Sequence, residues 1–360
     1  MIKNISIIGL GLIGGSIAKA LKASGKDFSI SAYDSNKETI KKALKEKVIN
    51  AELVSLNSAA DSDLIFVCLP ADESLKVFEK LIPKLSAKNI ISDVCGVKSV
   101  FEEKINQIKT EAHYIGGHPM AGKEAGGYEN SDPLLFKNTV YLISSFAENC
   151  SRINDFKKII GMLGAKSRFI HPELHDKVVA RISHLPQLLA VALIHSVGDN
   201  KGRIDFLDYA AGGFRDLTRI ASSPFTSWES VLKFNREEII DAIETLYTNL
   251  DEIENHLASG DIKKIEKLFY LAKIKREKIS KDPKGFLNPL YDIYLELEDK
   301  PGTLRKVVNL IYDNSVNLKD IELQKFIDKY GGVFKLSFET KQDAKKIKSL
   351  LIKAGYKLKN

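Results

Sequence analysis

The hydrophobic pattern of roughly the first 170 residues alternates short apolar runs with longer amphipathic stretches. The runs have the length of buried strands, whereas the stretches between them repeat apolar residues at the three- and four-residue spacing of helices. This alternation is typical of βαβ units on a parallel sheet. The predicted strands are Ile5–Ile8, Ser29–Tyr33, Leu64–Leu69, Ile90–Ser92 and Val140–Ser144, and the predicted helices include Ser16–Ser24 and Asn36–Lys47.

The pattern becomes almost entirely helical from Pro172 to about Ile279. Two long apolar stripes run through this segment, and each must be buried against something. They are longer than one α/β domain covers, so we expect helices that pack on each other in a homodimer. The stripes comprise Val178, Val179, Ile182, Leu185, Leu188, Leu189, Ala192 and Leu193, and then Ile239, Ile240, Ile243, Leu246, Leu250, Ile253 and Leu257.

A third unit follows the predicted linker at 281–285. Its pattern reads strand, helix, two strands, helix, strand, which is the order of a small ferredoxin-like α+β sandwich. The predicted elements are a strand over Tyr291–Leu297, a helix opened by Pro301–Gly302, a strand pair with Gly331–Gly332 at its turn, a helix over Lys345–Leu351 and a last strand at Tyr356–Leu358. We therefore predict three domains: 1–170, 171–282 and 289–360.

The composition is that of an ordinary globular protein, with 44% hydrophobic and 28% charged residues. The net charge of +7 is spread over faces that interleave both signs, whereas a nucleic-acid binder more often concentrates its charge on one stripe. The apolar runs are shorter than the ~20 residues of a membrane span, and no signal-peptide pattern opens the chain. Three scattered cysteines, Cys68, Cys95 and Cys150, form neither a disulfide framework nor a zinc ribbon. We expect a cytoplasmic protein without a nucleic-acid or membrane partner.

A glycine-rich turn follows the first predicted strand. Gly9, Gly11 and Gly14 form a G-x-G-x-x-G motif that runs directly into a helix, and Asp34 lies twenty positions after Gly14, at the end of the next strand. This context predicts a dinucleotide site, with the pyrophosphate at the helix N-terminus and the acidic residue on the ribose hydroxyls. Because Asp34 would repel a 2′-phosphate and the next basic residue is only Lys37, we predict NAD rather than NADP as the cofactor.

A candidate catalytic histidine stands in the stretch from Gly116 to Glu124. His118 is bracketed by glycines and a proline, which predicts a loop, and its spacing alone fits a catalytic or a structural role equally. The histidines at 171, 175, 184 and 195 lack the spacing of a metal site, so no metal is expected, and His184 is read as a buried pocket residue.

Six ordered motifs together resemble the prephenate/arrogenate dehydrogenase family of tyrosine biosynthesis, over nearly all of the first two segments. They are Gly9–Ser16, Asp93–Lys98, Gly117–Glu124, Pro172–Asp176, Ser183–Pro186 and Gly212–Ala221. The resemblance implies an NAD-dependent oxidative decarboxylation of prephenate that yields 4-hydroxyphenylpyruvate, carbon dioxide and NADH. Arrogenate dehydrogenation, which gives tyrosine directly, stays open as the alternative.

The resemblance also assigns roles to residues of this chain. His118 matches the catalytic histidine, which accepts the proton of the substrate hydroxyl, and Arg219 matches the guanidinium that holds a substrate carboxylate. Ser183 and His184 fall at substrate-binding positions. The chain departs from the commoner pattern at Gly96, where many members have a serine that shares the hydroxyl contact.

A second departure concerns the substrate's side chain. Gln187 stands where many members have a second histidine, and we expect it to face the pyruvyl group of prephenate or the alanyl group of arrogenate. The single tryptophan, Trp228, matches a residue near the neighbouring subunit's active site, and a core position fits it equally. The family also dimerises through this helical segment.

The last seventy or so residues resemble the ACT domain, an amino-acid-sensing module. The resemblance rests on Asp299 and the Pro301–Gly302 pair between a strand and a helix. Asp299, Gly302 and Asn317 are the predicted regulatory residues, with tyrosine as the expected feedback inhibitor and phenylalanine second. A purely assembling role stays open, because Ser315 stands where a glycine often leaves room for the ligand.

Two other functions compete with this interpretation. One is a different NAD(P)-dependent dehydrogenase or reductase with a helical dimerisation domain, which would leave the His118 motif and Arg219 unexplained. The other is a non-catalytic amino-acid sensor that uses NAD only structurally. The second alternative predicts that no NADH forms from prephenate.

Overall fold

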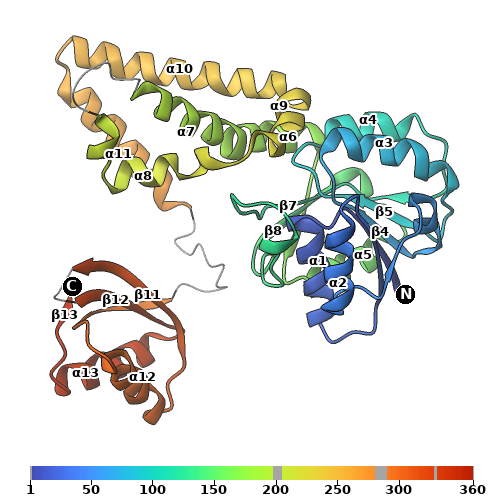
Figure 1. The fold of residues 1–360 in the computed structure, drawn as a ribbon. Helices are drawn as coiled ribbons and strands as arrows, with labels where there is room; N and C mark the ends of the chain where they lie inside the picture. Colours follow the sequence, from blue (N-terminus) through green and yellow to red (C-terminus); the bar gives the residue numbers. More distant parts are fainter. Residues whose placement is uncertain (1, 198–204, 280–289, 328–330, 360) are drawn as a thin grey trace. The chain divides into compact units, whose positions relative to one another are not determined.

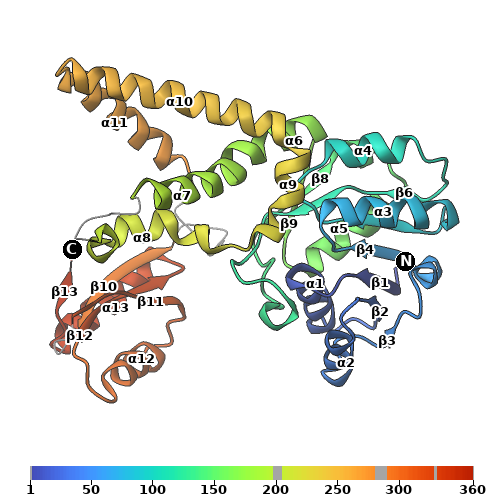
Figure 2. The same ribbon diagram turned by 45° about the horizontal axis from the view of Figure 1, so that its top comes forward.

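Six parallel strands form the central sheet of the N-terminal unit, in the order β3-β2-β1-β4-β5-β6 (Figures 1 and 2). This order reverses direction between β1 and β4, and in such sheets ligands bind beyond the carboxyl ends of the strands at that point. The strands are β1 Asn4–Ile8, β2 Ser29–Tyr33, β3 Ala51–Glu52, β4 Leu64–Val67, β5 Ile90–Asp93 and β6 His113–Tyr114. The predicted parallel sheet is confirmed. The predicted strand Val140–Ser144 also forms, but it belongs to a second sheet and not to this one.

The computed structural model describes residues 2–197, 205–279, 290–327 and 331–359. By contacts the chain divides into two units, residues 1–269 and 270–360. The boundary lies within helix α11, Ile262–Glu277. The predicted linker at 281–285 falls outside the described residues.

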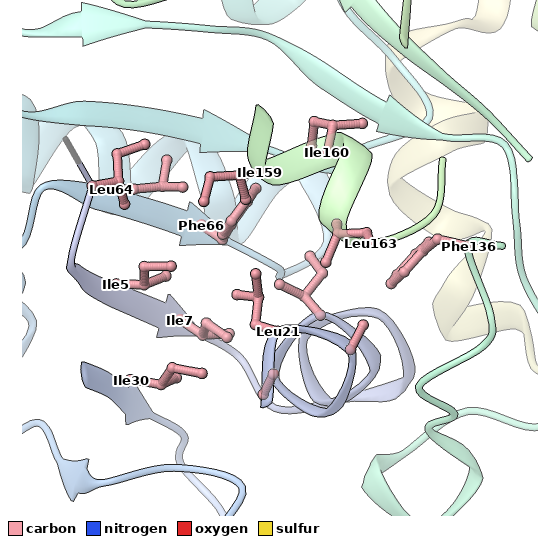
Figure 3. Packing of buried hydrophobic residues seen from close by; sticks show 14 of the residues in the cluster. Ile5, Ile7, Leu21, Ile30, Leu64, Phe66, Phe136, Ile159, Ile160 and Leu163 are labelled. Carbon is pink, nitrogen blue, oxygen red and sulfur yellow. The ribbon is translucent and has the colours of Figure 1, made fainter. Parts of the chain in front are cut away.

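Helices cover both faces of the central sheet, so alternate residues of its strands enter two separate cores. Ile5, Ile7 and Phe66 share one core with residues of the helices α1, α2 and α5. Figure 3 shows Leu21 of α1 and Ile159 of α5 in this core. Ile8 and Ile65 point to the other face, which α3 and α4 cover. The helices are α1 Leu12–Ala23, α2 Lys37–Lys45, α3 Ala71–Leu81, α4 Ser99–Asn106 and α5 Ile153–Met162.

A second, three-stranded sheet carries His118. It consists of β7 Gly117–Pro119, β8 Val140–Ser144 and β9 Lys166–Ile170, with β7 antiparallel to β8 and β8 parallel to β9. His118 pairs with Leu142 in this sheet, so the expectation of a loop at His118 is wrong. The physical reason is the packing of Tyr141, since a Cβ at Gly117 would lie 2.6 Å from its hydroxyl oxygen. The glycine before His118 therefore allows two strands to meet rather than marking a turn.

The segment after β9 is helical, as its apolar stripes predict. In the described part of this segment, Ala180, Ile239 and Ala242 form a small core with partly buried neighbours around them. One continuous run of helix, Pro172–Ser196, is long and apolar enough by composition alone to cross a membrane. The helices are α6 Pro172–Val179, a π-helical turn at Ala180–His184, α7 Leu185–Ser196, α8 Gly212–Thr218, α9 Glu229–Phe234, α10 Arg236–Ala258 and α11.

The C-terminal unit is a four-stranded antiparallel sheet with two helices packed on one face (Figure 1). Its sheet order, β11-β12-β10-β13, with β10-α12-β11-β12-α13-β13 along the chain, is that of the predicted ferredoxin-like sandwich. Gly331 and Gly332 belong to β12 and pair with β11, so their predicted place at the turn is wrong. The elements are β10 Tyr291–Leu297, α12 Thr303–Asp313, β11 Leu318–Ile327, β12 Gly331–Phe338, α13 Lys341–Lys353 and β13 Leu358–Lys359.

Phe66 offers a direct test of the core that lies between the central sheet and the helices α1 and α5. Its ring is fully buried and lies 5.9 Å, centroid to centroid, from that of Phe156. We expect Phe66→Ala to lower the free energy of unfolding by about 3–5 kcal/mol, because the change leaves a cavity between sheet and helix. Val54, 93% exposed, is the control, and Val54→Ala should change that free energy by less than about 0.5 kcal/mol. Equal effects in denaturant titrations would contradict this assignment of the core.

Candidate active site

The loop between β1 and α1 has the geometry of a dinucleotide-binding turn. Gly9 has a φ of +94°, and a Cβ there would lie 2.6 Å from the Cys68 carbonyl oxygen. A Cβ at Gly14 would collide with the Gly9 carbonyl oxygen, so the helix needs glycine to pack on the turn. Gly11 has open space where a Cβ would stand. The three glycines thus provide the turn, the open approach and the close packing that such a site requires.

Asp34 lies directly after β2 and anchors this loop. Its carboxylate accepts hydrogen bonds from the backbone N–H of Leu10 at 2.7 Å and of Asn36 at 2.8 Å. The side chain is partly exposed and lies outside the lining of the main cavity. Each carboxylate oxygen retains a lone pair, so the position fits the ribose-binding role predicted from the sequence.

A cavity of about 450 Å³ opens beside the glycine loop and extends to the helical segment. Gly11, Leu12 and Ile13 form its wall at the N-terminus of α1, where backbone N–H groups and the helix dipole favour an anion. The structure brings His118, Gly96, Ser183 and His184 together in the same lining. Other lining residues come from distant parts of the chain: Cys68, Leu69, Val94, Cys95, Ala121, Lys123, Glu124, Ser223, Trp228 and Ser230.

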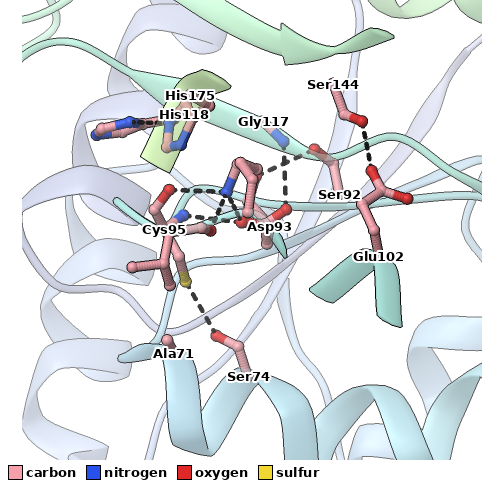
Figure 4. A network of polar contacts seen from close by, with 12 residues as sticks. Ala71, Ser74, Ser92, Asp93, Cys95, Glu102, Gly117, His118, Ser144 and His175 are labelled. Atoms are coloured by element: carbon pink, nitrogen blue, oxygen red, sulfur yellow. Dashed lines mark hydrogen bonds and ion pairs between the residues drawn. The ribbon is translucent and has the colours of Figure 1, made fainter. Parts of the chain in front are cut away.

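His118 is the first member of a chain of hydrogen bonds (Figure 4). Its Nδ1 lies 2.8 Å from Nε2 of His175, whose own Nδ1 lies 2.7 Å from Oδ1 of Asp176. The Asp176 carboxylate also accepts the backbone N–H groups of Lys98 at 2.8 Å and of Ser99 at 2.9 Å. The His175 and Asp176 side chains are almost fully buried, so this chain is rigidly enclosed.

The donors and acceptors of this chain determine the tautomers. An ionised carboxylate only accepts, so Nδ1 of His175 carries the hydrogen and its Nε2 accepts from Nδ1–H of His118. Nε2 of His118 is therefore left with a lone pair that faces the cavity. Burial lowers the pKa of His118 well below its ordinary value, and the neighbouring His175, Lys98 and His184 lower it further. His118 is neutral at pH 7 and can accept a proton.

A buried ion pair beneath the cavity holds the surrounding loops. Lys98 and Asp93 are almost completely buried and bonded to each other, and Lys98 Nζ also donates to the carbonyls of Cys95 at 2.7 Å and Val97 at 2.8 Å. The other oxygen of Asp93 accepts from the Gly117 N–H at 3.2 Å, next to His118 (Figure 4). The pair therefore fixes the turn that carries Gly96 and the start of the strand that carries His118.

Burial makes the two thiols of the lining poor nucleophiles. Burial raises the pKa of Cys95 to about 12 and that of Cys68 well above its ordinary value. Both groups therefore remain protonated at neutral pH, and a thiol is a poor nucleophile. Within the described ranges, no group of three or more histidine, cysteine or acidic residues is arranged to hold a metal ion.

Two predicted substrate residues lie at or beyond the cavity's edge. Arg219, whose side chain is 63% exposed, forms an ion pair with Glu124 of the lining but is not itself in the lining. Gln187 is buried and donates through Nε2 to the Ile220 carbonyl at 2.9 Å, beside Arg219 in the chain. The structure therefore places Gln187 behind the Arg219 segment, and not in the cavity wall.

Trp228 lies in the cavity of its own chain. Its ring packs edge-on against His184, with 6.0 Å between the ring centroids. His175, Asp176, Asp93 and Lys98 stand inside the family-like motifs of the sequence, but the sequence alone assigns no role to any of them. A charged residue at the end of an apolar run, such as Asp93 at the end of the buried strand β5, is the sequence signal that could have identified such buried polar residues.

The predicted regulatory residues belong to the C-terminal unit. Asn317 lines an open hollow of about 610 Å³ together with Tyr312, Asp313, Ser315 and Val316. Ser315 has a φ of 55°, in the left-handed region that favours glycine. Gly302 precedes α12 with a φ of +84°, and neither it nor the exposed Asp299 lines the hollow.

Family models match most of the N-terminal unit. The model for "Prephenate dehydrogenase, nucleotide-binding domain" matches residues 17–169, and that for "Prephenate dehydrogenase, dimerization domain" matches residues 171–271. A prephenate dehydrogenase of Lactococcus lactis is 32% identical over 356 residues, covering 98% of each chain.

Solved structures agree with this match. The prephenate dehydrogenase of A. aeolicus, in complex with hydroxyphenyl propionate and NAD⁺, has a TM-score of 0.72 at 29% identity and covers 78% of this chain and 99% of its own. An arogenate dehydrogenase of Synechocystis has a TM-score of 0.67 at 28% identity and covers 77% of this chain and 100% of its own. The site fits this match, because an ordered series of hydrogen bonds ends in a cavity beside a dinucleotide-binding turn. Two family models and a relative that is 32% identical over 98% of each chain show that this protein belongs to the prephenate dehydrogenase family.

Proposed function

We propose that this chain oxidises and decarboxylates prephenate with NAD, giving 4-hydroxyphenylpyruvate, carbon dioxide and NADH. The observation that carries the proposal is the lone pair on Nε2 of His118, which the Asp176–His175 chain directs into the cavity. A base at this place suits a reaction that removes a hydroxyl proton while a hydride leaves the same carbon. The alternative of a non-catalytic sensor gives no reason for such an ordered base.

The glycine loop and Asp34 fit NAD. The open space at Gly11 and the first backbone N–H groups of α1 would hold the pyrophosphate, and Asp34 would accept the ribose hydroxyls. The chemistry that bound NAD supplies is acceptance of the hydride from the ring carbon that bears the hydroxyl group. The negative charge of Asp34 disfavours the additional phosphate of NADP.

His118 accepts one proton from the substrate and later returns it. Its Nε2 accepts the hydroxyl proton as the carbon–hydrogen bond breaks and the oxygen becomes a carbonyl. The bond from the ring to its carboxylate then breaks, carbon dioxide leaves, and the electron pair passes through the ring to that oxygen. The oxygen takes the proton back from His118 to become a phenol, so the reaction neither consumes nor releases a proton.

Arg219 is the proposed holder of the substrate carboxylate outside the ring. Its guanidinium already pairs with the carboxylate of Glu124 at the cavity edge, which supports its availability to a carboxylate there. Ser183, which lines the cavity beside His184, is proposed to contact the substrate as well. Gln187 supports this arrangement indirectly, through its bond to the Ile220 carbonyl.

The helical segment is proposed to form a homodimer. Tyr247, Leu250, Ile253 and Leu257 make one exposed apolar stripe along α10, at the spacing of a single helix face. The match of this region to a dimerization domain supports a second copy as its cover. The apolar run Pro172–Ser196 is proposed to pack within the protein and not in a membrane, because it carries the buried polar residues His175, Asp176 and His184.

The chain is proposed to comprise three domains, 1–170, 171–282 and 289–360, in the cytoplasm. The cysteines at 68, 95 and 150 are free, which suits a reducing compartment. The third domain is proposed to be an ACT-type regulatory module, on the basis of its strand order and of Asp299 and Gly302 at the start of α12. Tyrosine is the proposed ligand, near the hollow that Asn317 lines.

Absorbance of NADH tests the function directly. Prephenate and arrogenate are each supplied with NAD or NADP, and we expect the highest kcat/KM with prephenate and NAD. A preference for arrogenate would transfer the proposal to that substrate. Failure to form NADH with either substrate would remove the proposed function.

His118→Asn should keep the fold and the affinity for NAD while lowering kcat about 10²–10⁴-fold, the usual contribution of a general acid–base. The reason is that the amide has no basic nitrogen. His195, exposed on α7, provides the matched control, and His195→Asn should leave kcat unchanged. A loss of less than tenfold in His118→Asn would show that His118 only positions the substrate.

Tyrosine should inhibit the full chain through its C-terminal unit. We expect a truncation after residue 283 to stay active and to lose most of this inhibition, and Asn317→Ala in the full chain to weaken it. Linkage also requires substrate to change tyrosine affinity by the factor by which tyrosine changes substrate affinity. An unchanged inhibition curve in an active truncated enzyme would place tyrosine elsewhere, for instance in the active site as a product analogue.

A further inference from the structure

A single buried amide connects the helix that carries His175 to the third histidine of the site, the buried His184. Asn235 stands between α9 and α10 and is 3% exposed. Its Nδ2 donates to the backbone carbonyl of Asp176 at 2.9 Å and lies 3.1 Å from Nδ1 of His184. Asp176 is also the carboxylate that orders His175 and His118.

This arrangement determines the tautomer of His184. A carbonyl oxygen only accepts, so the group of Asn235 that faces Asp176 must be the NH₂ and not the amide oxygen. The second hydrogen of the same NH₂ then points to Nδ1 of His184, which must accept it. A neutral His184 therefore carries its hydrogen on Nε2, and burial, which lowers its pKa to about 4, keeps it neutral at pH 7.

The two Nε2 atoms face one small space. A Cβ at Gly96 would lie 3.8 Å from Nε2 of His118 and 3.8 Å from Nε2 of His184, and its nearest neighbour, Cε1 of His118, would be 3.7 Å away. Gly96 leaves that space open to the cavity. One wall of it therefore offers an acceptor, His118, and the other offers a donor, His184.

We propose that Asn235 is a positioning residue that holds His184 as its Nε2–H tautomer, so that His184 donates a hydrogen bond to the substrate oxygen that His118 deprotonates. This inference rests on the proposed function, because it needs a substrate whose reacting oxygen enters the space beside Gly96. His184 is then a catalytic residue by its contact with the reacting oxygen, and Asn235 acts only through it.

The donor is useful at both stages of the reaction. Negative charge grows on the oxygen as its proton moves to His118, and the electron pair of the broken carbon–carbon bond later arrives on the same oxygen. A fixed N–H aimed at developing charge stabilises the transition state without reorganisation. With the tautomer reversed, Nε2 of His184 would instead present a lone pair to that charge.

Asn235→Leu removes the amide and keeps its approximate size. We expect kcat with prephenate to fall about ten- to hundredfold while the KM for NAD changes less than twofold. The loss is smaller than the ~10²–10³-fold for complete removal of such a donor, because His184 still samples the correct tautomer. Asn249, exposed on α10 and bonded to the Thr245 carbonyl of the same helix, is the control, and Asn249→Leu should leave kcat unchanged.

A hydroxyl at position 96 should replace the lost donor, because its Cβ fits between the two imidazoles at ordinary contact distance. Adding Gly96→Ser to Asn235→Leu should therefore recover at least threefold in kcat, a gain that repair of a packing defect would not produce. An unchanged kcat in Asn235→Leu, or a loss that Gly96→Ser fails to recover, would overturn the inference.

The tautomer itself is measurable in the unaltered enzyme by ¹⁵N NMR of labelled histidines, with His184→Phe used for assignment. We expect a protonated Nε2 and an unprotonated, hydrogen-bonded Nδ1 for His184, and the reverse would overturn the inference even if Asn235→Leu fails to fold. The proposed function fails separately. If the unaltered enzyme forms no NADH from prephenate or arrogenate, the function falls, whereas turnover insensitive to Asn235→Leu removes only the role of Asn235.

Discussion

The Asp176 carboxylate is the interaction on which the arrangement of this site depends. It accepts the backbone N–H groups of Lys98 and Ser99, at the start of α4, and Nδ1–H of His175 on its own helix. It therefore joins the nucleotide-binding sheet to the helical segment and, in the same contact, orders the imidazoles that end at His118. Although burial opposes its ionisation, the hydrogen bond from His175 and the other donors hold the pKa of Asp176 below its ordinary value. A neutral carboxyl group would leave the order of donors undefined.

The buried charges of the site are tolerable because Asp93 pairs with Lys98 and Asp176 bonds to His175 and to backbone N–H groups. An unpaired buried charge is strongly destabilising, whereas Asp93 and Lys98 neutralise each other and bond the loops around them. The positive charge of Lys98 also lowers the pKa of His118. The same buried network thus fixes the geometry of the cavity and keeps its base unprotonated. Stability and reactivity depend here on the same contacts.

Local spacing was sufficient to predict the nucleotide-binding half, since a G-x-G-x-x-G turn and its acidic partner are set by neighbouring residues. The sandwich topology of the last unit also followed from alternation and helix spacing. Contacts between distant residues did not: Asn235 meets His184 and Asp176 across 51 and 59 positions, and nothing in its neighbourhood marks it. The glycines around His118 suggest a loop and Gly331 suggests a turn, yet Gly117 makes room for Tyr141 and Gly331 for the Leu297 carbonyl, both within sheets.

The most direct test of the account is the pH dependence of kcat/KM for prephenate, which reports the pKa of the base in the free enzyme. The base is cationic when protonated, so lowering its pKa preserves the active, neutral form to lower pH; His175, Lys98 and His184 all act on it in that direction. We predict a constant kcat/KM from pH 8 down through 6.5, the ordinary value for histidine, with a decline only below it. A decline centred at or above pH 6.5 would contradict a buried, neutral His118 at the end of the Asp176–His175 chain.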